Sequence, residues 1–420
     1  MGAEVLPDEV SWRKRCADDP ELAALGKAAE VTFAVSSGEQ TVAIGFADGR
    51  PGDPGGPAEF TLRAGVEDWS RFLQAVPPSP YHSFFGMLMR VPTAAVEGDE
   101  LTFVQHAHLL RRVLEIAREM QSGWSRPAVA AAGADGAAHP DDLDHIVGRY
   151  VTLRPADAPV RVFYEESGAG RDVVLLHTAG ADGRQYHHLM NDPRLRDGCR
   201  MIALDLPWHG RSSPTAPGLP GEYELSTDMY CDTVMGLVDA LDLHSPVVVG
   251  SSMGGEICLE LAYRYPDRLG GVVACEASDR VTGRQVQWAR HPKVNQALFV
   301  PEWVDGLMAP QSPQEYRREV WWGYSQGGFG TFFGDICFYS GEWDARDRVH
   351  LIDTTRCPVV MLTGEYDYSC TPQMSAETAD RIPGSVFREM RGLGHFPMSE
   401  NPPVFAEHLL TALAEIGEAS

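Results

Sequence analysis

The sequence predicts an α/β fold with a mostly parallel sheet, preceded by a smaller α+β domain. After about residue 143, apolar strand-like segments alternate with amphipathic helical segments, which is the pattern of parallel sheets. Before about residue 122, three strand-like segments precede two helical ones. Between these parts, residues 123–142 consist mainly of Ala, Gly, Pro and Asp, a composition typical of a linker. The 420 residues are therefore expected to form two domains, 1–122 and 143–420.

The first domain is predicted to begin with a β-hairpin. Residues 31–37 and 41–49 alternate between apolar and polar side chains and are separated by a Gly-Glu-Gln turn. A third strand is expected at residues 58–65. Helical spacing of apolar side chains follows at residues 66–76 and 100–121.

The order of these elements, with the segments EFTLRAGVEDWSRFL and VEGDELTFV, resembles the sterol-carrier-like family of small lipid-binding domains. The resemblance covers about 100 residues. It implies a sheet and helices around an apolar tunnel, and hence lipid binding. The alternative is a degenerate domain that forms a homodimer or covers the second domain.

The second domain shows seven apolar strand patterns and two long amphipathic helices, at 226–243 and 405–417. The strands are predicted at residues 161–167, 172–180, 200–207, 246–255, 270–278, 357–367 and 386–395. A long stretch rich in aromatic residues interrupts this alternation, so we predict a helical lid at about 278–355. Because lids cover the strand ends where ligands lie, these rings predict a hydrophobic or aromatic small-molecule substrate.

The composition excludes several functional classes. The chain has 35 basic and 59 acidic residues, a formal net charge of −24, and would repel nucleic acid. Its eight cysteines form no CxxC pair, so free thiols in a reducing compartment are expected. There is no signal-peptide core and no apolar run of about 20 residues. These features predict a cytoplasmic protein without a membrane span.

The strongest local motif is Gly250-Ser251-Ser252-Met253-Gly254, a G-x-S-x-G sequence between an apolar strand and a helix. Such a tight turn requires small residues two positions before and after the serine, and it lifts the hydroxyl clear of the backbone. The N-terminus of the following helix favours negative charge. We therefore predict that Ser252 is a nucleophile, whereas Ser251 is out of register with the two glycines.

A serine hydroxyl needs a base that is held by an acid, and the expected chain order is serine, acid, histidine. One predicted strand ends with two acids, Glu365 and Asp367, and His395 follows in a Gly-rich loop before the last helix. We predict Asp367 and His395 as the partners of Ser252. Glu365 and Glu276 are the alternatives for the acid.

These motifs resemble the α/β-hydrolase superfamily over about residues 148–418. Its acid usually lies in a G-x-x-D pattern, matched by residues 364–367, and its histidine in a G-x-G-H pattern, matched by residues 392–395. The resemblance implies a catalytic triad of Ser252, Asp367 and His395 that works without a metal ion or a cofactor.

The resemblance also implies an oxyanion site made by two backbone amides. One is the amide of Met253, directly after the nucleophile, and by position the other is that of Ala179. Thr178 stands where the family often has glycine, and Gly180 is expected to compensate for this departure. Thr178 and His177 are also candidate substrate contacts, with a structural hydrogen-bonding role as the alternative for His177.

Two tryptophans complete the candidate substrate contacts. Residues 205–212 resemble the D-x-P-G-x-G-x-S stretch of the family, and Trp208 replaces a small residue there. Trp322 is the candidate from the lid. The alternative for both is packing within the loop or the lid.

The sequence thus predicts a serine hydrolase that cleaves an ester, lactone or thioester of a hydrophobic small molecule through an acyl-enzyme. A carbon–carbon bond hydrolase of a dienoic diketone is the nearest alternative, because that branch also has Ser-Met-Gly-Gly and a helical lid. It usually has tryptophan after the catalytic histidine, where this chain has Phe396. An acyltransferase using the same triad and a lipid-binding protein without activity are further alternatives.

Overall fold

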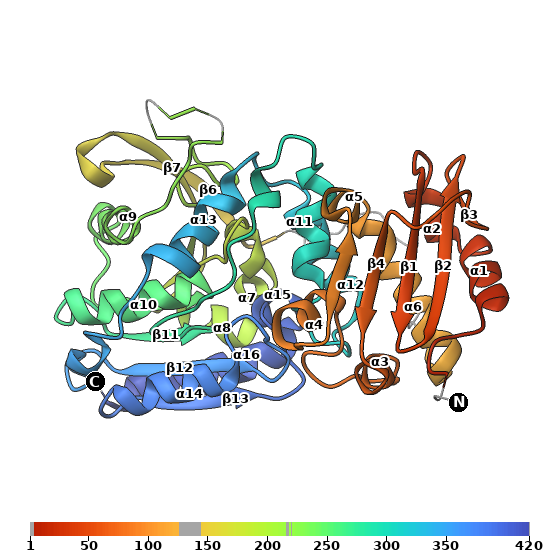
Figure 1. Ribbon diagram of the computed structural model, residues 1–420. Coiled ribbons are helices and arrows are strands. Elements are labelled where there is room, and N and C mark those ends of the chain that lie inside the picture. The colour runs from red at the N-terminus through yellow and green to blue at the C-terminus, as the bar shows by residue number, and fades with distance from the viewer. Residues whose placement is uncertain (1–3, 126–143, 216–217, 220, 420) are drawn as a thin grey trace, which may run out of the picture. The chain divides into compact units, whose positions relative to one another are not determined.

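The structure, a computed structural model, describes residues 4–125, 144–215, 218–219 and 221–419. The chain forms two compact units, shown in Figure 1. Unit 1 comprises Met1–Ala128 and His291–Gln311, and unit 2 comprises Val129–Arg290 and Ser312–Ser420. The predicted linker at 123–142 lies, apart from its first three residues, outside the described residues.

Unit 1 is built on a five-stranded sheet in the order β3-β2-β1-β4-β5. The expected hairpin is present as the antiparallel pair β1 and β2, closed by Gly38 at φ +60°, and β4 pairs with β1 in parallel. The strands are β1 (Val31–Ser37), β2 (Gln40–Ala47), β3 (Arg50–Gly52), β4 (Phe60–Ala64) and β5 (Ala95–Gly98). The helices are α1 (Glu9–Ala17), α2 (Pro20–Leu25), α3 (Val66–Phe72), α4 (Phe84–Arg90), α5 (Glu100–Gln105) and α6 (Ala107–Ser122).

The single helix predicted at residues 100–121 is wrong, because the structure contains two helices, α5 and α6, that meet at His106. The backbone of His106 has φ −112° and ψ 12°, outside the helical region. Its ring Nδ1 lies 2.8 Å from the carbonyl oxygen of Thr102, so the side chain occupies a backbone acceptor of the preceding turn. Apolar periodicity continues across this break, which is why the sequence pattern does not reveal it.

Part of the predicted lid belongs to unit 1. Helix α11 (Gln296–Asp305) packs against α6, and Arg111 Nε donates a hydrogen bond to Glu302 at 2.8 Å. Phe299 and Val304 of α11 are only 1% and 2% exposed. The range 278–355, predicted as one lid of the second domain, is therefore divided between the two units.

Unit 2 contains an eight-stranded sheet in the order β13-β12-β11-β10-β8-β9-β7-β6. Strands β6 and β7 join it in antiparallel fashion, and the other neighbours are parallel. The strands are β6 (Val147–Leu153), β7 (Val160–Gly168), β8 (Arg171–Leu176), β9 (Cys199–Leu204), β10 (Val247–Ser251), β11 (Gly271–Cys275), β12 (Val359–Gly364) and β13 (Val386–Met390). The prediction of a mostly parallel α/β sheet preceded by a smaller α+β unit is confirmed.

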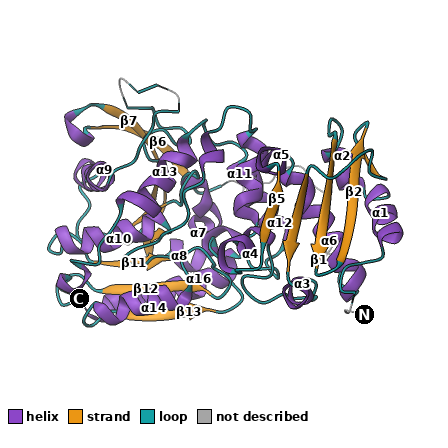
Figure 2. Cartoon of the chain, in the orientation of Figure 1, coloured by secondary structure: helices purple, strands orange, loops and turns teal. Residues whose placement is uncertain are grey.

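Helices cover this sheet, as Figure 2 shows in purple beside the orange strands. Every residue of β10, β11 and β12 is buried, which is typical of parallel strands covered on both faces. The longer helices are α9 (Thr227–Ala240), α10 (Met253–Arg264), α12 (Gln314–Tyr324), α13 (Thr331–Cys337), α14 (Pro372–Arg381) and α16 (Pro402–Ala419). The short helical segments are η2 (Pro155–Asp157), η3 (Gly183–Tyr186), α7 (His187–Asn191), α8 (Pro193–Arg196), η4 (Gln287–Arg290), η5 (Phe338–Glu342), η6 (Val349–Leu351) and α15 (Pro397–Glu400). Because the parallel strands end at one edge, the residues that follow β8, β10, β11, β12 and β13 gather there.

Two further expectations are free cysteine thiols and the absence of a membrane span. All eight cysteines are free, and seven of them are buried. Burial raises the pKa of the Cys258 thiol well above its ordinary value, which makes such a thiol unreactive. Within the described residues, no helix is both long and apolar enough to cross a membrane.

Candidate active site

The turn between β10 and α10 holds Ser252 in a strained backbone conformation, with φ 60° and ψ −121°. A Cβ atom on Gly250 would lie 2.2 Å from the carbonyl oxygen of Gly254, and one on Gly254 would lie 2.8 Å from that of Leu176. Side chains are therefore excluded at both glycine positions of the G-x-S-x-G motif. The amide of Ser252 donates to the carbonyl oxygen of Cys275 at 2.9 Å, which anchors the turn to β11.

The structure brings two predicted residues, Asp367 and His395, into direct contact. His395 Nδ1 lies 2.6 Å from Asp367 Oδ2. The other carboxylate oxygen accepts hydrogen bonds from the amides of Ser369 and Cys370, at 2.7 and 3.1 Å. Both Asp367 and His395 are buried. The carboxylate is thus fixed in orientation and favours the imidazole tautomer with a proton on Nδ1.

The loop that carries His395 is shaped by Glu400, which the sequence patterns did not single out. Glu400 Oε1 accepts hydrogen bonds from the amides of Gly394 and Phe396, on either side of the histidine, at 2.8 and 3.1 Å. Its Oε2 accepts one from the hydroxyl of Ser312 at 2.7 Å. The available signal is an acid five residues after His395, at the end of the short helix α15.

The two alternative acids lie in different surroundings. Glu365 is exposed and accepts a hydrogen bond from the amide of Gly392 at 2.9 Å. Glu276 is fully buried after β11, with both oxygens 3.1 Å from the amide nitrogen of Gly364. One oxygen of Glu276, one of Asp367 and one ring nitrogen of His395 lie within 4.8 Å of one another. Burial, the charge of Asp367 and a hydrogen bond with it raise the pKa of Glu276 well above its ordinary value.

The predicted oxyanion donors are the buried backbone amides of Ala179 and Met253. Neither amide has a hydrogen-bond acceptor within the part of the chain that the structure describes. The next amide in the loop, that of Gly180, donates instead to Asp335 Oδ2 at 2.7 Å. Gly180 has φ +69°, a left-handed conformation that favours glycine. The loop therefore makes its unusual turn at Gly180, one residue after the predicted donor Ala179.

Helix α13 carries the buried carboxylate of Asp335, which sequence analysis also missed. Asp335 Oδ2 lies 2.7 Å from His209 Nε2, and Oδ1 accepts a hydrogen bond from the hydroxyl of Tyr223 at 2.9 Å. His209 Nδ1 lies 3.0 Å from the carbonyl oxygen of Pro207, so both ring nitrogens face acceptors. Burial opposes a charged imidazole, but Asp335 outweighs it and raises the pKa of His209. The buried carboxylate that pairs with His209 thus also holds the amide of Gly180.

His177 is fully buried beside this pair and belongs to the loop scaffold. Its Nε2 accepts a hydrogen bond from the amide of Leu206 at 3.1 Å. The proton therefore lies on Nδ1, which donates to the carbonyl oxygen of Thr178 at 2.9 Å. Burial and the neighbouring His209 lower the pKa of His177 to about 4, so the ring is neutral. Both ring nitrogens are bonded to backbone, which leaves neither for a substrate.

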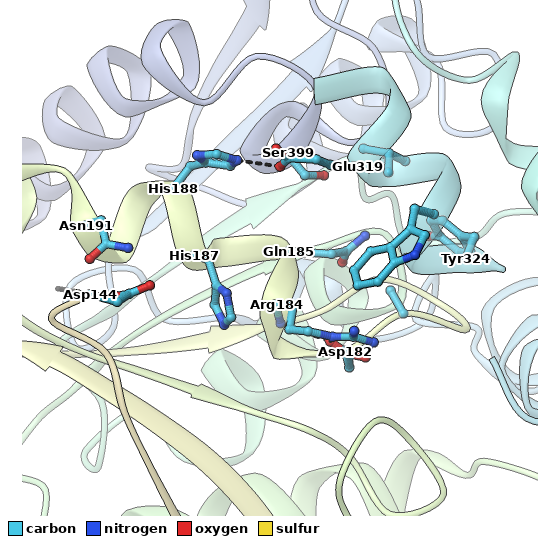
Figure 3. A pocket seen from close by; sticks show the side chains of 14 residues that line it. Asp144, Asp182, Arg184, Gln185, His187, His188, Asn191, Glu319, Tyr324 and Ser399 are labelled. Atoms are coloured by element: carbon cyan, nitrogen blue, oxygen red, sulfur yellow. Dashed lines mark hydrogen bonds and ion pairs between the residues drawn. The ribbon is translucent and has the colours of Figure 1, made fainter. Parts of the chain in front are cut away.

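Thr178 connects the loop to helix α12. Its hydroxyl lies 2.6 Å from the hydroxyl of Tyr324, and its amide donates to Gln185 Oε1 at 3.0 Å. Gln185 and Tyr324 also line a pocket of about 450 Å³ beside α7 and α12, shown in Figure 3. The His188–Glu319 pair, with 2.6 Å between Nε2 and Oε2, also lines this pocket. The pocket therefore lies against Gln185 and Tyr324, the two side chains that hold Thr178.

The two predicted tryptophan contacts occupy different places. Trp208 is half-buried with φ +73°, and its Nε1 donates to the hydroxyl of Thr215 at 2.9 Å. Trp322 is 59% exposed and lines the pocket of Figure 3. Neither Ser252 nor His395 is among the described residues that line this pocket. The structure therefore does not bring Trp322 together with the predicted triad residues Ser252 and His395 in this pocket.

Aromatic rings surround His395. The ring of Tyr339 lies 6.4 Å from the imidazole, measured between centroids, and that of Phe396 lies 5.1 Å away. Phe396 in turn lies 5.4 Å from Tyr324. Tyr324 and Tyr339 come from the range predicted as the lid, so one of its rings contacts the histidine and another contacts the neighbouring Phe396.

Comparison with known proteins gives relatives with several names. A 2-hydroxy-6-oxononadienedioate/2-hydroxy-6-oxononatrienedioate hydrolase of Pseudomonas putida is 30% identical over 129 residues, covering 30% of this chain and 43% of that protein. The hydrolase of the same name from Paraburkholderia xenovorans is 28% identical over 166 residues, covering 38% of this chain and 55% of that protein. The chain thus spans about half the length of these curated relatives.

Solved structures resemble unit 2 in fold. A thermophilic esterase from Thermogutta terrifontis matches with a TM-score of 0.56 and 22% identity, covering 64% of this chain and 99% of that one. The enol-lactonase from Burkholderia xenovorans matches with a TM-score of 0.54 and 21% identity, covering 63% and 100%. These likenesses confirm the predicted α/β-hydrolase fold.

Residues 173–408, more than half of the chain, match the family model described as "Alpha/beta hydrolase family". The chain belongs to the alpha/beta hydrolase family.

Proposed function

We propose that this protein is a serine hydrolase that cleaves an ester, lactone or thioester of a hydrophobic or aromatic small molecule. The observation that carries the proposal is the 2.6 Å contact between His395 Nδ1 and Asp367 Oδ2. The strained turn that carries Ser252 is close to this pair, because the hydroxyl of the preceding Ser251 donates to the carbonyl oxygen of His395 at 3.4 Å. A buried carboxylate–imidazole pair beside a strained serine is the arrangement that activates a hydroxyl.

In the proposed reaction, Ser252 Oγ attacks the substrate carbonyl and its proton passes to His395 Nε2. Asp367 stabilises the imidazolium by accepting the hydrogen bond from Nδ1. The amides of Ala179 and Met253 donate to the oxyanion as the carbonyl carbon becomes tetrahedral. His395 then gives its proton to the leaving group, and water attacks the acyl-enzyme by the same route.

The substrate class is inferred from the surroundings of His395. The rings of Tyr324, Tyr339 and Phe396 supply apolar surface, and they suit an uncharged acyl group. The names of two structural neighbours, an esterase and an enol-lactonase, support carboxylic ester or lactone substrates.

Carbon–carbon bond hydrolysis is the second candidate, because the curated relatives from Pseudomonas putida and Paraburkholderia xenovorans carry the name of dienedioate hydrolases. Phe396 stands where that branch usually has tryptophan, which favours the ester or lactone substrate. Parallel assays with p-nitrophenyl esters, aryl lactones and a 2-hydroxy-6-oxo-dienoate would separate the two. Turnover of the dienoate alone would overturn our preference.

Acyl transfer remains an outcome of the same assays. An acyltransferase would pass the acyl group from Ser252 to an alcohol, so added alcohol would change the product mixture. For unit 1 we propose a degenerate sterol-carrier-like domain that forms a homodimer or covers the second domain, with lipid binding as the alternative. Native mass spectrometry of the full chain, with and without added fatty acid, would distinguish a lipid adduct from a doubled mass.

A fluorophosphonate probe tests the nucleophile directly. We expect the wild-type protein to be labelled and Ser252→Ala to remain unlabelled. Ser251→Ala is the matched control, because Ser251 is also a buried hydroxyl in the same turn, and it should retain the label. Undiminished labelling of Ser252→Ala would contradict the assignment, and no labelling of the wild type would overturn the serine mechanism.

A further inference from the structure

Glu276 has no role in the mechanism above, yet the fold holds it tightly beside the proposed triad. It follows β11 with φ +52°, a left-handed conformation that is strained for a residue other than glycine. Its amide donates to the carbonyl oxygen of Leu362 at 2.9 Å, which fixes the strained backbone to β12. Its side chain is 0% exposed. Such strain persists only where the surrounding structure imposes it, and it is frequent at active sites.

Of the titratable groups near Glu276, only His395 can carry a positive charge. The others are the carboxyl groups of Asp367 and Glu400 and the thiols of Cys275 and Cys370. His395 already makes its 2.6 Å contact with Asp367, so it does not neutralise a second carboxylate. Two adjacent buried carboxyl groups cannot both be ionised at low cost, and a shared proton resolves the conflict.

The hydrogen bonds decide which of the two carboxyl groups carries that proton. Asp367 receives three donors, the amides of Ser369 and Cys370 and the ring of His395, and all three favour a carboxylate. Among the described residues, one backbone amide donates to Glu276, that of Gly364, which lies 3.1 Å from both carboxyl oxygens. A neutral carboxyl group accepts that amide on its carbonyl oxygen and still has an O–H to donate.

We propose that Glu276 is a positioning residue that remains a carboxylic acid throughout turnover and donates its O–H to Asp367. The inference rests on the proposed hydrolase function. The proton of Glu276 stays on Glu276, and the proton that Ser252 releases goes to His395. Asp367 therefore keeps its negative charge and its orientation toward His395 while the imidazolium forms. Glu276 acts through Asp367 and does not touch the substrate.

A metal ion would be another way to neutralise the cluster, since a histidine and two carboxylates are suitable ligands. The geometry argues against this. Two ligand atoms of one tetrahedral zinc ion lie about 3.3 Å apart when each bond is about 2.0 Å. His395 Nδ1 and Asp367 Oδ2 are 2.6 Å apart, which is a hydrogen-bond distance.

The first test is the pH profile of kcat/KM for a p-nitrophenyl ester in Glu276→Gln. An amide reproduces the donor and the acceptor of a carboxylic acid, so we expect kcat within about threefold of wild type. The midpoint of the acidic limb should move by less than about 0.3 pH unit. If Glu276 were a carboxylate, the substitution would remove a charge next to His395 and lower that midpoint by more than about one unit, which would overturn the proposal.

The second test removes the donor while keeping the volume. Glu276→Leu should lower kcat about tenfold or more and change KM less than about twofold, because Asp367 loses a hydrogen bond that orients it. The matched control is Glu256→Leu, another fully buried glutamate, which lies outside the cluster. We expect the control to keep wild-type kcat. Equal kcat values for Glu276→Leu and wild type would overturn the inference and leave the serine mechanism standing.

An infrared difference spectrum reports protonation without using activity. Wild type minus Glu276→Gln at pH 7 should show the C=O band of a protonated carboxyl group, and a carboxylate band in its place would overturn the proposal. Activity that is lost with EDTA and restored by zinc would overturn it in favour of a metal site. If the fluorophosphonate probe fails to label the wild type, the serine mechanism falls and the positioning role falls with it.

Discussion

Glu276, near His395, and Asp335, behind the loop of residues 178–180, are both buried acids, but their neighbours give them opposite roles. Glu276 faces another carboxyl group, and burial together with that neighbour raises its pKa. Asp335 faces an imidazole, and it raises the pKa of His209 against the effect of burial. The first acid is suited to donate a hydrogen bond and the second to accept three. Whether a buried acid in this region donates or accepts hydrogen bonds therefore depends on the group that it faces.

The largest expected effect on activity is that of replacing Asp367, the acid that contacts His395. Asp367→Asn should lower kcat about 10⁴-fold, because the amide donates to Nδ1 and stabilises the wrong imidazole tautomer. KM should change little, and steady-state kinetics with a p-nitrophenyl ester measures both. Glu365→Gln is the control from the same loop, with an exposed side chain, and should stay within about threefold of wild type. The reverse ranking would transfer the role of the acid to Glu365.

A smaller effect is expected from replacing Asp335, and it should appear mainly in the free energy of unfolding. Asp335→Ala leaves His209 buried without its carboxylate and should lower the free energy of unfolding by about 3–5 kcal/mol. Asp335→Asn keeps an acceptor for the amide of Gly180 and should cost less. Urea unfolding at pH 6 measures both variants.

The pH dependence of that effect has a definite sign. The pKa of His209 is raised in the folded state, so its contribution is complete below the ordinary value of about 6.5 and is lost as pH rises through the raised value. The difference between wild type and Asp335→Ala should therefore shrink at high pH. A difference that grows with pH would show that His209 is neutral when folded.

The smallest expected effect comes from His177, whose ring centroid lies 4.8 Å from that of His209. Its pKa is lowered to about 4, so the unfolded chain takes up a proton below pH 6.5 while the folded protein does not. Stability should fall by up to ~3 kcal/mol between pH 6.5 and 4. His177→Gln should lose this part of the acid sensitivity in pH-dependent unfolding, and an unchanged acid limb would contradict a neutral His177.

The sequence predicts the parts of this site that depend on local geometry. The glycines around Ser252 are required by close contacts at the turn, and Asp367 and His395 lie in the short loops after β12 and β13, so short motifs indicate all three predicted residues. Asp335 and Glu400 are not indicated by such motifs. Asp335 binds the amide of Gly180, which is distant in the sequence. Glu400 binds amides of a nearby loop whose shape no motif encodes.

The same limit applies to the fold. The alternation of apolar strand segments with amphipathic helices predicts the parallel sheet. The strand segments are apolar throughout because the central strands are buried along their whole length. The break at His106 and the assignment of residues 291–311 to unit 1 depend on packing partners, and apolar periodicity does not distinguish one partner from another. The proposed protonation of Glu276 likewise depends on Asp367, which lies in the loop after a different strand, β12.

The return of residues 291–311 to unit 1 means that the polypeptide passes between the units three times. Unit 1 is therefore a discontinuous module, completed only after more than half of unit 2 has been synthesised. A truncated chain beginning at residue 143 would keep α11 but lack α6, exposing the apolar face that carries Phe299 and Val304. Such a truncation tests solubility as much as function.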